Sequence, residues 1–248
     1  MKTALKTLAA LALLAAGNAF ATGSLVDVTV YDRAEGQTLP VHYHRGKYYV
    51  AGKPGNEYQV VIRNRGGEDI LAVLSVDGVN AVTGETASTR QSGYVIGPWG
   101  SVEVKGWRKS LERTAAFYFT ALPDSYAART GRPDDVGVIG VAVFRRKPAP
   151  PPEPLSQDRI QRGAAEAPAS APAPRAKMEE KLGTGHGRNE HSPGRYVEFE
   201  RESSTPSETV VLYYDSRPNL MAQGVIREPR PPRDPRPFPA GFVPDPPR

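Results

Sequence analysis

The sequence predicts an all-β protein, an antiparallel β-sandwich, and three observations favour this fold class. Hydrophobic and polar residues alternate in several short segments, for example at Val26, Val28 and Val30, which is the pattern of half-buried strands. Glycine and proline interrupt the chain at short intervals, with 24 and 25 copies in 248 residues, and this is typical of turns. Helix signals are scarce, and parallel strands need long crossover connections that the sequence does not supply.

Residues 1–21 have the features of a secretory signal peptide. Lys2 and Lys6 precede an apolar run, 8–16, and a small-x-small cleavage site follows at Ala19-Phe20-Ala21. The apolar run is too short to span a bilayer, and no later segment reaches the length of a transmembrane helix. We therefore expect an exported protein of the periplasm or the extracellular space. The chain contains no cysteine, so its stability must come from a hydrophobic core rather than from disulfides.

Residues 22–147 are predicted to form the main β-sandwich domain. The alternating segments predict half-buried strands, whereas two runs that are apolar on both faces, 70–76 and 136–144, predict central strands covered on both sides. One short segment, 124–129, carries helix signals and lasts one or two turns. The remaining predicted strands are 26–31, 58–63, 102–104 and 115–120.

Three regions follow the main domain. Residues 148–180 are rich in proline and alanine and poor in large apolar residues, which predicts an extended linker. Residues 181–228 regain apolar and aromatic character, and we expect a β-hairpin region that completes the sandwich, because a few short strands are a poor free-standing domain. Residues 229–248 form a Pro/Arg-rich tail that is predicted to be extended.

The hairpin of the C-terminal region is placed around Thr205-Pro206-Ser207. The segments 196–204 and 209–216 are its predicted strands, and 220–226 is a candidate third strand. The glycine-rich run 181–191 is interpreted as a loop that re-enters the domain after the linker. An anion-binding loop is the alternative, but no strand precedes the run and no helix clearly follows it, so the context of a phosphate-binding motif is missing.

The segment LAVLSVDGVNAVTGE, residues 71–85, contains the clearest turn signal. Asp77-Gly78 predicts a two-residue hairpin, since glycine tolerates a positive φ and aspartate is common beside it. This register places Val76 opposite Val79 and Ser75 opposite Asn80. The polar residues Asp77, Asn80 and Glu85 are also candidates for contact with a ligand.

An aromatic platform for a sugar or a peptide is the first candidate binding site. Trp99 and Trp107 flank the predicted strand at 101–105, and Tyr94 and Arg108 are close to them in the sequence. Large aromatic side chains with a polar edge suit such contacts, although packing in the core or at the rim of a sandwich is the alternative interpretation.

Two histidines form the candidate metal site. On a strand, His42 and His44 would point to the same face, which is a workable geometry for two ligands. No carboxylate follows closely, so an ordinary surface pair is the alternative and no cofactor is expected. Asp134 and Asp135 lie in a turn-like run, and no serine occupies a G-x-S-x-G motif.

Several longer motifs suggest a family. The segments VLSVDGVN (73–80), GYVIGP (93–98), GWRKS (106–110) and VGVIGVAVF (136–144) together resemble an uncharacterised family of exported bacterial proteins with no assigned function. The segments LGTGHGRNE, VEFER and YYDSRPNL also resemble parts of that family. The resemblance implies one all-β unit, and it implies no activity, ligand or catalytic residue.

The sequence therefore favours an exported binding protein or an envelope-associated interaction protein, with an envelope protein or a polysaccharide as partner. A hydrolase acting on cell-wall or sugar polymers is the alternative, and the sequence leaves open whether the protein is an enzyme. The formal net charge is +5, but the basic residues are scattered rather than focused on one stripe. Nucleic acid is therefore not an expected partner.

Overall fold

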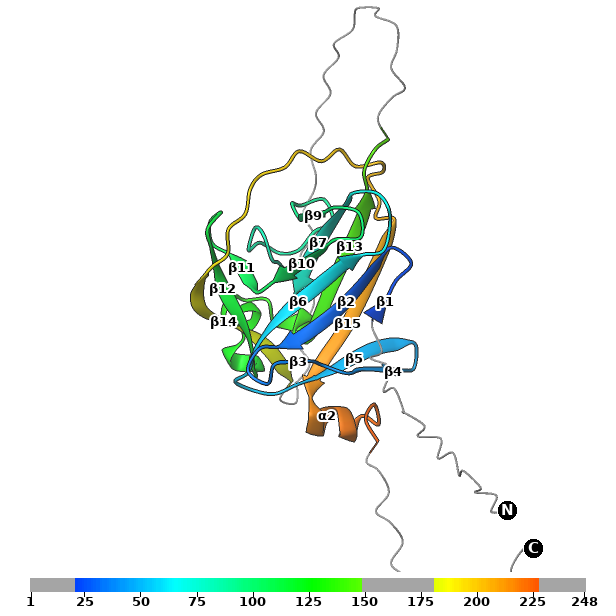
Figure 1. Cartoon of the computed structure of the whole chain (residues 1–248). Helices are drawn as coiled ribbons and strands as arrows, with labels where there is room; N and C mark the ends of the chain where they lie inside the picture. The colour runs from blue at the N-terminus through cyan, green and yellow to red at the C-terminus, as the bar shows by residue number, and fades with distance from the viewer. Residues whose placement is uncertain (1–20, 149–180, 228–248) are drawn as a thin grey trace, which may run out of the picture.

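The protein is an all-β sandwich of two sheets, as the sequence predicts (Figure 1). The computed structural model describes residues 21–148 and 181–227. The predicted tail and nearly all of the predicted signal peptide and linker lie outside these residues. In the described parts, no helix is long and apolar enough to cross a membrane.

The strands divide between two sheets, which we call sheet A and sheet B. Sheet A contains β1 (Ala21–Thr22), β2 (Val26–Asp32), β3 (Gln37–Thr38), β6 (Glu57–Asn64), β10 (Ser101–Val104), β11 (Gly106–Arg108), β12 (Arg113–Ala121) and β14 (Leu182–His191). Sheet B contains β4 (Val41–His44), β5 (Lys47–Gly52), β7 (Ile70–Val76), β8 (Val79–Asn80), β9 (Tyr94–Ile96), β13 (Val138–Arg145) and β15 (Glu208–Ser216). The helices are η1 (Leu122–Asp124), α1 (Tyr126–Arg129), η2 (Pro133–Asp135) and α2 (Arg217–Ala222).

The core lies between the two sheets and follows the hydrophobic pattern of the sequence. In β2, buried and half-buried residues alternate along the whole strand. The central strands β7 and β13 are covered on both faces, as predicted. Their outer face carries a small second cluster of Leu71, Val73, Ala142 and Phe144, against which Phe199 packs. Phe199 belongs to the segment 192–207, which arches over one end of the sandwich between β14 and β15 (Figure 1).

The turn between β7 and β8 confirms the predicted hairpin. Val76 pairs with Val79 and Ser75 pairs with Asn80, so Asp77 and Gly78 form the two-residue tip. Both tip residues are left-handed, with φ of 53° and 70°, which is the conformation that a type I′ turn requires.

The C-terminal region completes the sandwich, but it does so without the expected hairpin. β14 pairs with β12 in sheet A, whereas β15 lies in sheet B, antiparallel to β13 and parallel to β5. The two strands therefore enter different sheets. The expectation of antiparallel pairing alone is wrong for the β5–β15 pair, because the long chain between these strands serves as the crossover connection. Most of the predicted strand 196–204 is irregular and exposed, because charged residues occupy four of its nine positions.

Two other C-terminal predictions are wrong for identifiable reasons. The candidate strand at 220–226 overlaps helix α2, which begins after Ser216. The Ser216 hydroxyl accepts a hydrogen bond from the Asn219 backbone N–H, and a proline occupies the first turn, and both features favour a helix start. The glycine-rich run is the long strand β14 rather than a loop. A Cβ atom at Gly185 would lie 2.2 Å from the Tyr118 ring, and one at Gly187 would lie 2.8 Å from the Ala116 carbonyl oxygen, so close packing explains these glycines.

Candidate functional site

An open hollow lies beside the first residues of β15. Its volume is about 380 Å³, and its lining comes from the start of β5, the start of β15 and the N-terminal residues of the described chain. The residues that matter for its chemistry are Gly23, Gly46, Lys47, Tyr48, Glu208 and Tyr213. We call this feature the β15 hollow.

One wall of the β15 hollow is fixed by Glu208. Its carboxylate accepts hydrogen bonds from the backbone N–H groups of Ser24, Leu25 and Val26, at 2.8 Å for Leu25 and 3.3 Å for Val26. Gly23 is needed beside it, because a Cβ atom there would lie 2.4 Å from the carboxylate. The negative charge of Glu208 is therefore used to hold the chain before β2 against β15.

The opposite wall carries aromatic rings and a cation. The Lys47 ammonium lies 4.8 Å from the centre of the Tyr213 ring, and Tyr49 packs against the same ring at 5.6 Å. Lys47 takes part in none of the ion pairs among the described residues. Tyr43 contacts Tyr48 at 5.3 Å and remains 68% exposed.

The charge of this region follows directly from the sequence. Residues 36–56 contain no aspartate or glutamate, but they include His42, His44, Arg45, Lys47 and Lys53. The β4–β5 hairpin turns at Arg45 and Gly46, both left-handed with φ of 47° and 80°. Lys53 is paired with Glu35, and Glu208 itself lines the β15 hollow, so Arg45 and Lys47 are the arginine and lysine of this region that can attract an acidic group of a ligand.

The predicted aromatic platform does not form as one surface. Trp107 is 3% exposed and packs edge-to-face on Phe117 at 4.7 Å, so it belongs to the core. Trp99 is 65% exposed in the turn between β9 and β10, and no ring contact among the described residues joins it to the others. Tyr94 and Arg108 do lie together, with the guanidinium carbon 5.9 Å from the ring centre.

The two candidate metal ligands, His42 and His44, lie on β4 opposite Tyr49 and Lys47 of β5. Within residues 21–148 and 181–227, no group of three or more histidine, cysteine or acidic side chains is arranged to hold a metal ion. Burial lowers the pKa of His42, and the nearby positive charge of Arg217 lowers it further. Both effects favour the neutral imidazole, but a third ligand is not found in these parts of the chain.

Asp77 at the hairpin tip is fully buried and is the centre of a polar network. Its Oδ1 accepts hydrogen bonds from the Gly137 N–H at 2.9 Å and the Tyr214 hydroxyl at 2.5 Å, and its Oδ2 accepts one from the Thr184 N–H at 2.7 Å. The Thr184 hydroxyl lies 2.6 Å from that of Tyr214 and 2.5 Å from that of Tyr58. Burial raises the pKa of Asp77 to about 6, although these hydrogen bonds act in the opposite direction.

This network joins the β7–β8 turn to β14 and β15, and it is enclosed by the core. Asp77 therefore holds the C-terminal strands in place and does not face a ligand from outside. Asn80 is also buried, and its side chain accepts hydrogen bonds from the N–H groups of Val82 and Thr83 while donating to the Ser92 carbonyl. Glu85 is exposed and pairs with the Gln91 side chain at 3.1 Å, so both residues order the loop after β8.

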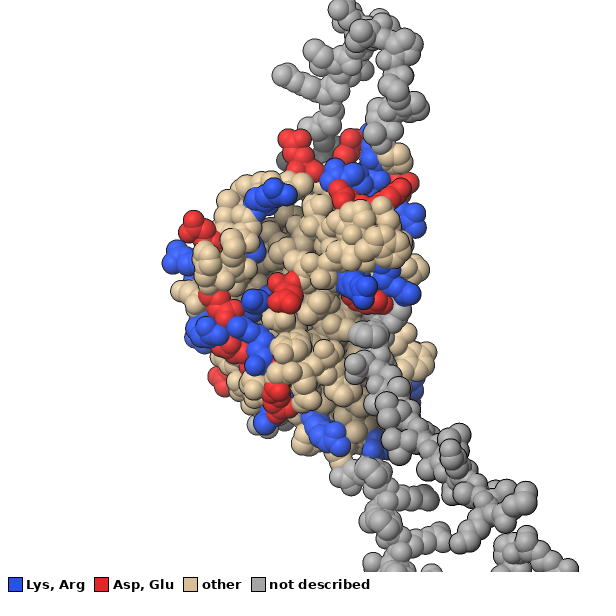
Figure 2. Space-filling model, viewed as in Figure 1, with Lys and Arg blue, Asp and Glu red and all other residues tan. Residues whose placement is uncertain are grey.

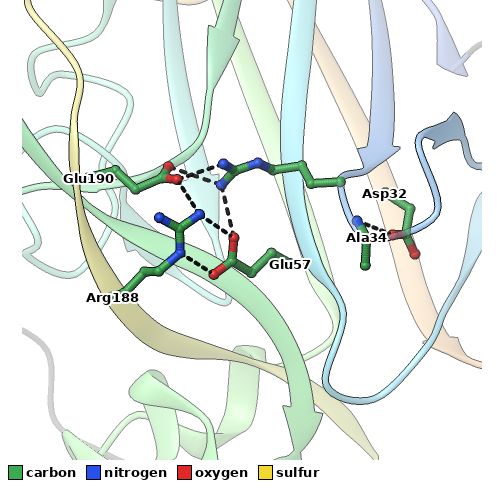
Figure 3. Close-up of polar contacts among 6 residues, drawn as sticks. Asp32, Ala34, Glu57, Arg188 and Glu190 are labelled. Atoms are coloured by element: carbon green, nitrogen blue, oxygen red, sulfur yellow. Dashed lines mark hydrogen bonds and ion pairs between the residues drawn. The ribbon is translucent and has the colours of Figure 1, made fainter.

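A cluster of four charged side chains joins β14 to the other strands of sheet A. Arg33 binds both carboxylate oxygens of Glu190 at 2.6 and 2.9 Å, and Arg188 binds both oxygens of Glu57 at 2.7 and 2.9 Å (Figure 3). Further contacts of 2.8 Å between Arg188 and Glu190 and 3.3 Å between Arg33 and Glu57 close the cluster. Its two positive and two negative charges balance, and hydrogen bonding to Arg188 holds the pKa of Glu57 below its usual value.

Charges on the rest of the visible surface are mixed. Figure 2 shows acidic and basic side chains interspersed on the face that it presents. Lys47 forms no ion pair among the described residues, in contrast to the arginines of the balanced cluster of Arg33, Glu57, Arg188 and Glu190.

Comparisons with protein-family models, curated proteins and solved structures found no match for this chain. The family resemblance drawn from the sequence motifs therefore stays a prediction.

Sequence reasoning did not find the β15 hollow, although two signals were present. Arg45-Gly46 separates two short alternating segments, VHYH and KYYV, and this is a two-residue hairpin signal. The acid-free run of residues 36–56 marks the same region as basic. No local sequence pattern indicates that Glu208 belongs to the β15 hollow, because its role depends on the pairing of strands far apart in the chain.

Proposed function

We propose that this protein is an exported binding protein of the cell envelope and that the β15 hollow is its ligand surface. The observation that carries the proposal is the Lys47 ammonium, which lies on the Tyr213 ring without an acidic partner among the described residues. Such a cation beside half-buried aromatic rings suits an anionic ligand with apolar surface. Export is supported by the signal-peptide features of residues 1–21.

No specific feature of the described residues favours the alternative of a hydrolase. The carboxylate of Asp77 is enclosed, and those of Glu57 and Glu190 are bound by arginines. These three groups therefore have structural partners already.

The test uses the chain from residue 22 onward, immobilised and exposed to solubilised envelope proteins and to envelope polysaccharide. We expect the double variant Lys47→Glu/Tyr213→Ala to lose binding by about tenfold or more, since it reverses the charge and removes a stacking ring. The matched control is Lys109→Glu/Tyr196→Ala, which makes the same chemical changes at exposed positions elsewhere. Equal binding by both double variants, with unchanged melting temperatures, would refute the proposal.

A further inference from the structure

We propose that the β15 hollow binds an extended polypeptide segment of a partner protein, carrying an acidic side chain, as an added strand beside the first residues of β15. This inference rests on the proposed binding function and names the class of ligand. It follows from the pairing of β15, from the space beside that strand and from the charge at the hollow.

The first half of β15 pairs with a strand on one side only, and β1 of sheet A lies near it without pairing. Glu208 to Val211 pair with Val143 to Gly140 of β13. On the other side, the parallel pairing with β5 begins at Leu212, which lies opposite Tyr48. β5 begins at Lys47, which the same register places opposite Val211, and the β4–β5 hairpin turns at Arg45 and Gly46, so β5 leaves Glu208 to Val210 uncovered.

The unpaired side presents backbone donors and acceptors. The Tyr214 N–H donates to the Gly137 carbonyl of the chain leading into β13, so the even-numbered residues of β15 direct their backbone groups toward β13. In an antiparallel ladder alternate residues face opposite sides, and Thr209 and Val211 therefore face the hollow. Outside the strand ladders, no backbone hydrogen bond among the described residues involves Thr209.

The space beside this edge is open enough for another backbone. A Cβ atom at Gly46 would meet nothing within 4 Å. The three uncovered strand residues extend over roughly 10 Å at about 3.3 Å per residue. An added segment would continue the line of β5 and pair with Thr209, and such strand addition is an established way of recognising extended peptides.

A polypeptide fits this edge better than a glycan does. Thr209 offers its N–H and C=O in strand geometry, which matches the backbone of an extended peptide, whereas sugar hydroxyls lack that spacing. Lys47 lies at the hollow and Arg45 in the adjacent turn, and neither forms an ion pair among the described residues, which favours an acidic side chain in the ligand. The chain's own residues 229–248 are a poor occupant, because prolines recur through most of that sequence and lack the N–H needed for pairing.

The experiment measures fluorescence anisotropy with a labelled hexapeptide, acetyl-Glu-Thr-Val-Thr-Val-Thr-amide, and the chain from residue 22 onward. Its comparison ligand is the same peptide with alternate amides N-methylated, which keeps the side chains but removes the pairing donors. We expect N-methylation to weaken binding by about tenfold or more, because ladder hydrogen bonds are lost. Binding should also protect the Thr209 amide from hydrogen exchange.

Variants of the protein test the same edge from the other side. Thr209→Pro removes the N–H that faces the hollow without touching the ladder to β13, while Thr209→Val keeps the N–H. We expect only the proline variant to weaken peptide binding by about tenfold. If Thr209→Pro fails to fold, the N-methylated peptide and hydrogen exchange on the unmodified chain still test whether the peptide adds as a strand to β15.

The outcomes separate this inference from the proposed function. Equal affinity for both peptides would overturn strand addition. The protein could instead bind polygalacturonate, an anionic polysaccharide, in a way that depends on Lys47, and fail to bind the peptide. That result would overturn the inference and leave the proposed binding function standing. The protein could also self-associate, lose this self-association in the Thr209→Pro variant and fail to bind the peptide. That result would assign the edge to a second copy of the chain and overturn the proposed partner.

Discussion

The Asp77 carboxylate provides a direct test of how the C-terminal strands are held. Asp77→Asn keeps the shape of the side chain but replaces one acceptor oxygen with an NH₂ donor. If that donor takes the place of Oδ2, it faces the Thr184 N–H; if it takes the place of Oδ1, it faces the Gly137 N–H. In both orientations one buried backbone N–H loses its acceptor, which costs about 1–3 kcal/mol.

The effect of Asp77→Asn on the free energy of unfolding depends on pH, because burial raises the pKa of Asp77 from 3.8 to about 6. The folded chain then binds this proton more tightly than the unfolded chain does. The resulting stabilisation is fully present below pH 3.8 and is lost as the pH rises through about 6. At about 1.36 kcal/mol per pKa unit, a rise from 3.8 to about 6 corresponds to about 3 kcal/mol.

Asparagine does not titrate, so the difference between the two proteins isolates this contribution. We expect Asp77→Asn to destabilise the fold by about 1–3 kcal/mol in acid. Above neutral pH the wild-type chain must bury a charge, and the variant should then be equally stable or more stable.

The assay is urea unfolding of both proteins at several pH values from acid to slightly alkaline, with free energies compared at each pH. Glu103→Gln, at an exposed position of β10, is the control and should show a small difference without this pH dependence. A free-energy difference for Asp77→Asn that stays constant across the range would refute the reasoning, since it would mean that the hydrogen bonds to the carboxylate offset its burial.

Two further substitutions test β14. Gly185→Ala should destabilise the protein by about 1–3 kcal/mol in urea unfolding, because the new Cβ would lie 2.2 Å from the Tyr118 ring. The control is Gly67→Ala, where a Cβ meets nothing within 4 Å. Equal losses of unfolding free energy in the two variants would contradict the packing argument. Arg33→Ala should cost about 1–3 kcal/mol because the nearly buried Glu190 loses its bidentate partner. A double-mutant cycle with Glu190→Gln should give a coupling energy that decreases with salt, and a coupling of zero would show that the pair contributes nothing.

Sequence reasoning succeeded where the signal is local. The alternation in β2 and the two-sided apolar runs of β7 and β13 reflect burial that each strand carries in its own residues. Asp77-Gly78 specified its turn because both tip residues must adopt a positive φ.

Prediction failed where the outcome depends on a distant partner. Segment 196–204 alternates like a strand, yet it does not form one. Phe199 packs against the second apolar cluster on the outer face of β7 and β13, whereas Val197 is exposed. The glycines of β14 suggested a loop because the Tyr118 ring that requires Gly185 lies on another strand. The sequence leaves Trp107 open to a place on a binding surface or in the core, because it does not show that Phe117 and Tyr126 enclose the ring.

The position of β15 also affects the order in which the chain can fold. β15 is the last strand among the described residues, but it lies between β5 and β13, and its pairing joins Leu212 to Tyr48 across most of the chain. Until β15 is available, sheet B consists of two separate pieces, β4–β5 and the strands around β13. Contacts of such high sequence separation slow folding, so the emerging chain should stay open until its C-terminal region is present. For a chain that is threaded across a membrane before it folds, that delay would keep the polypeptide competent for transport.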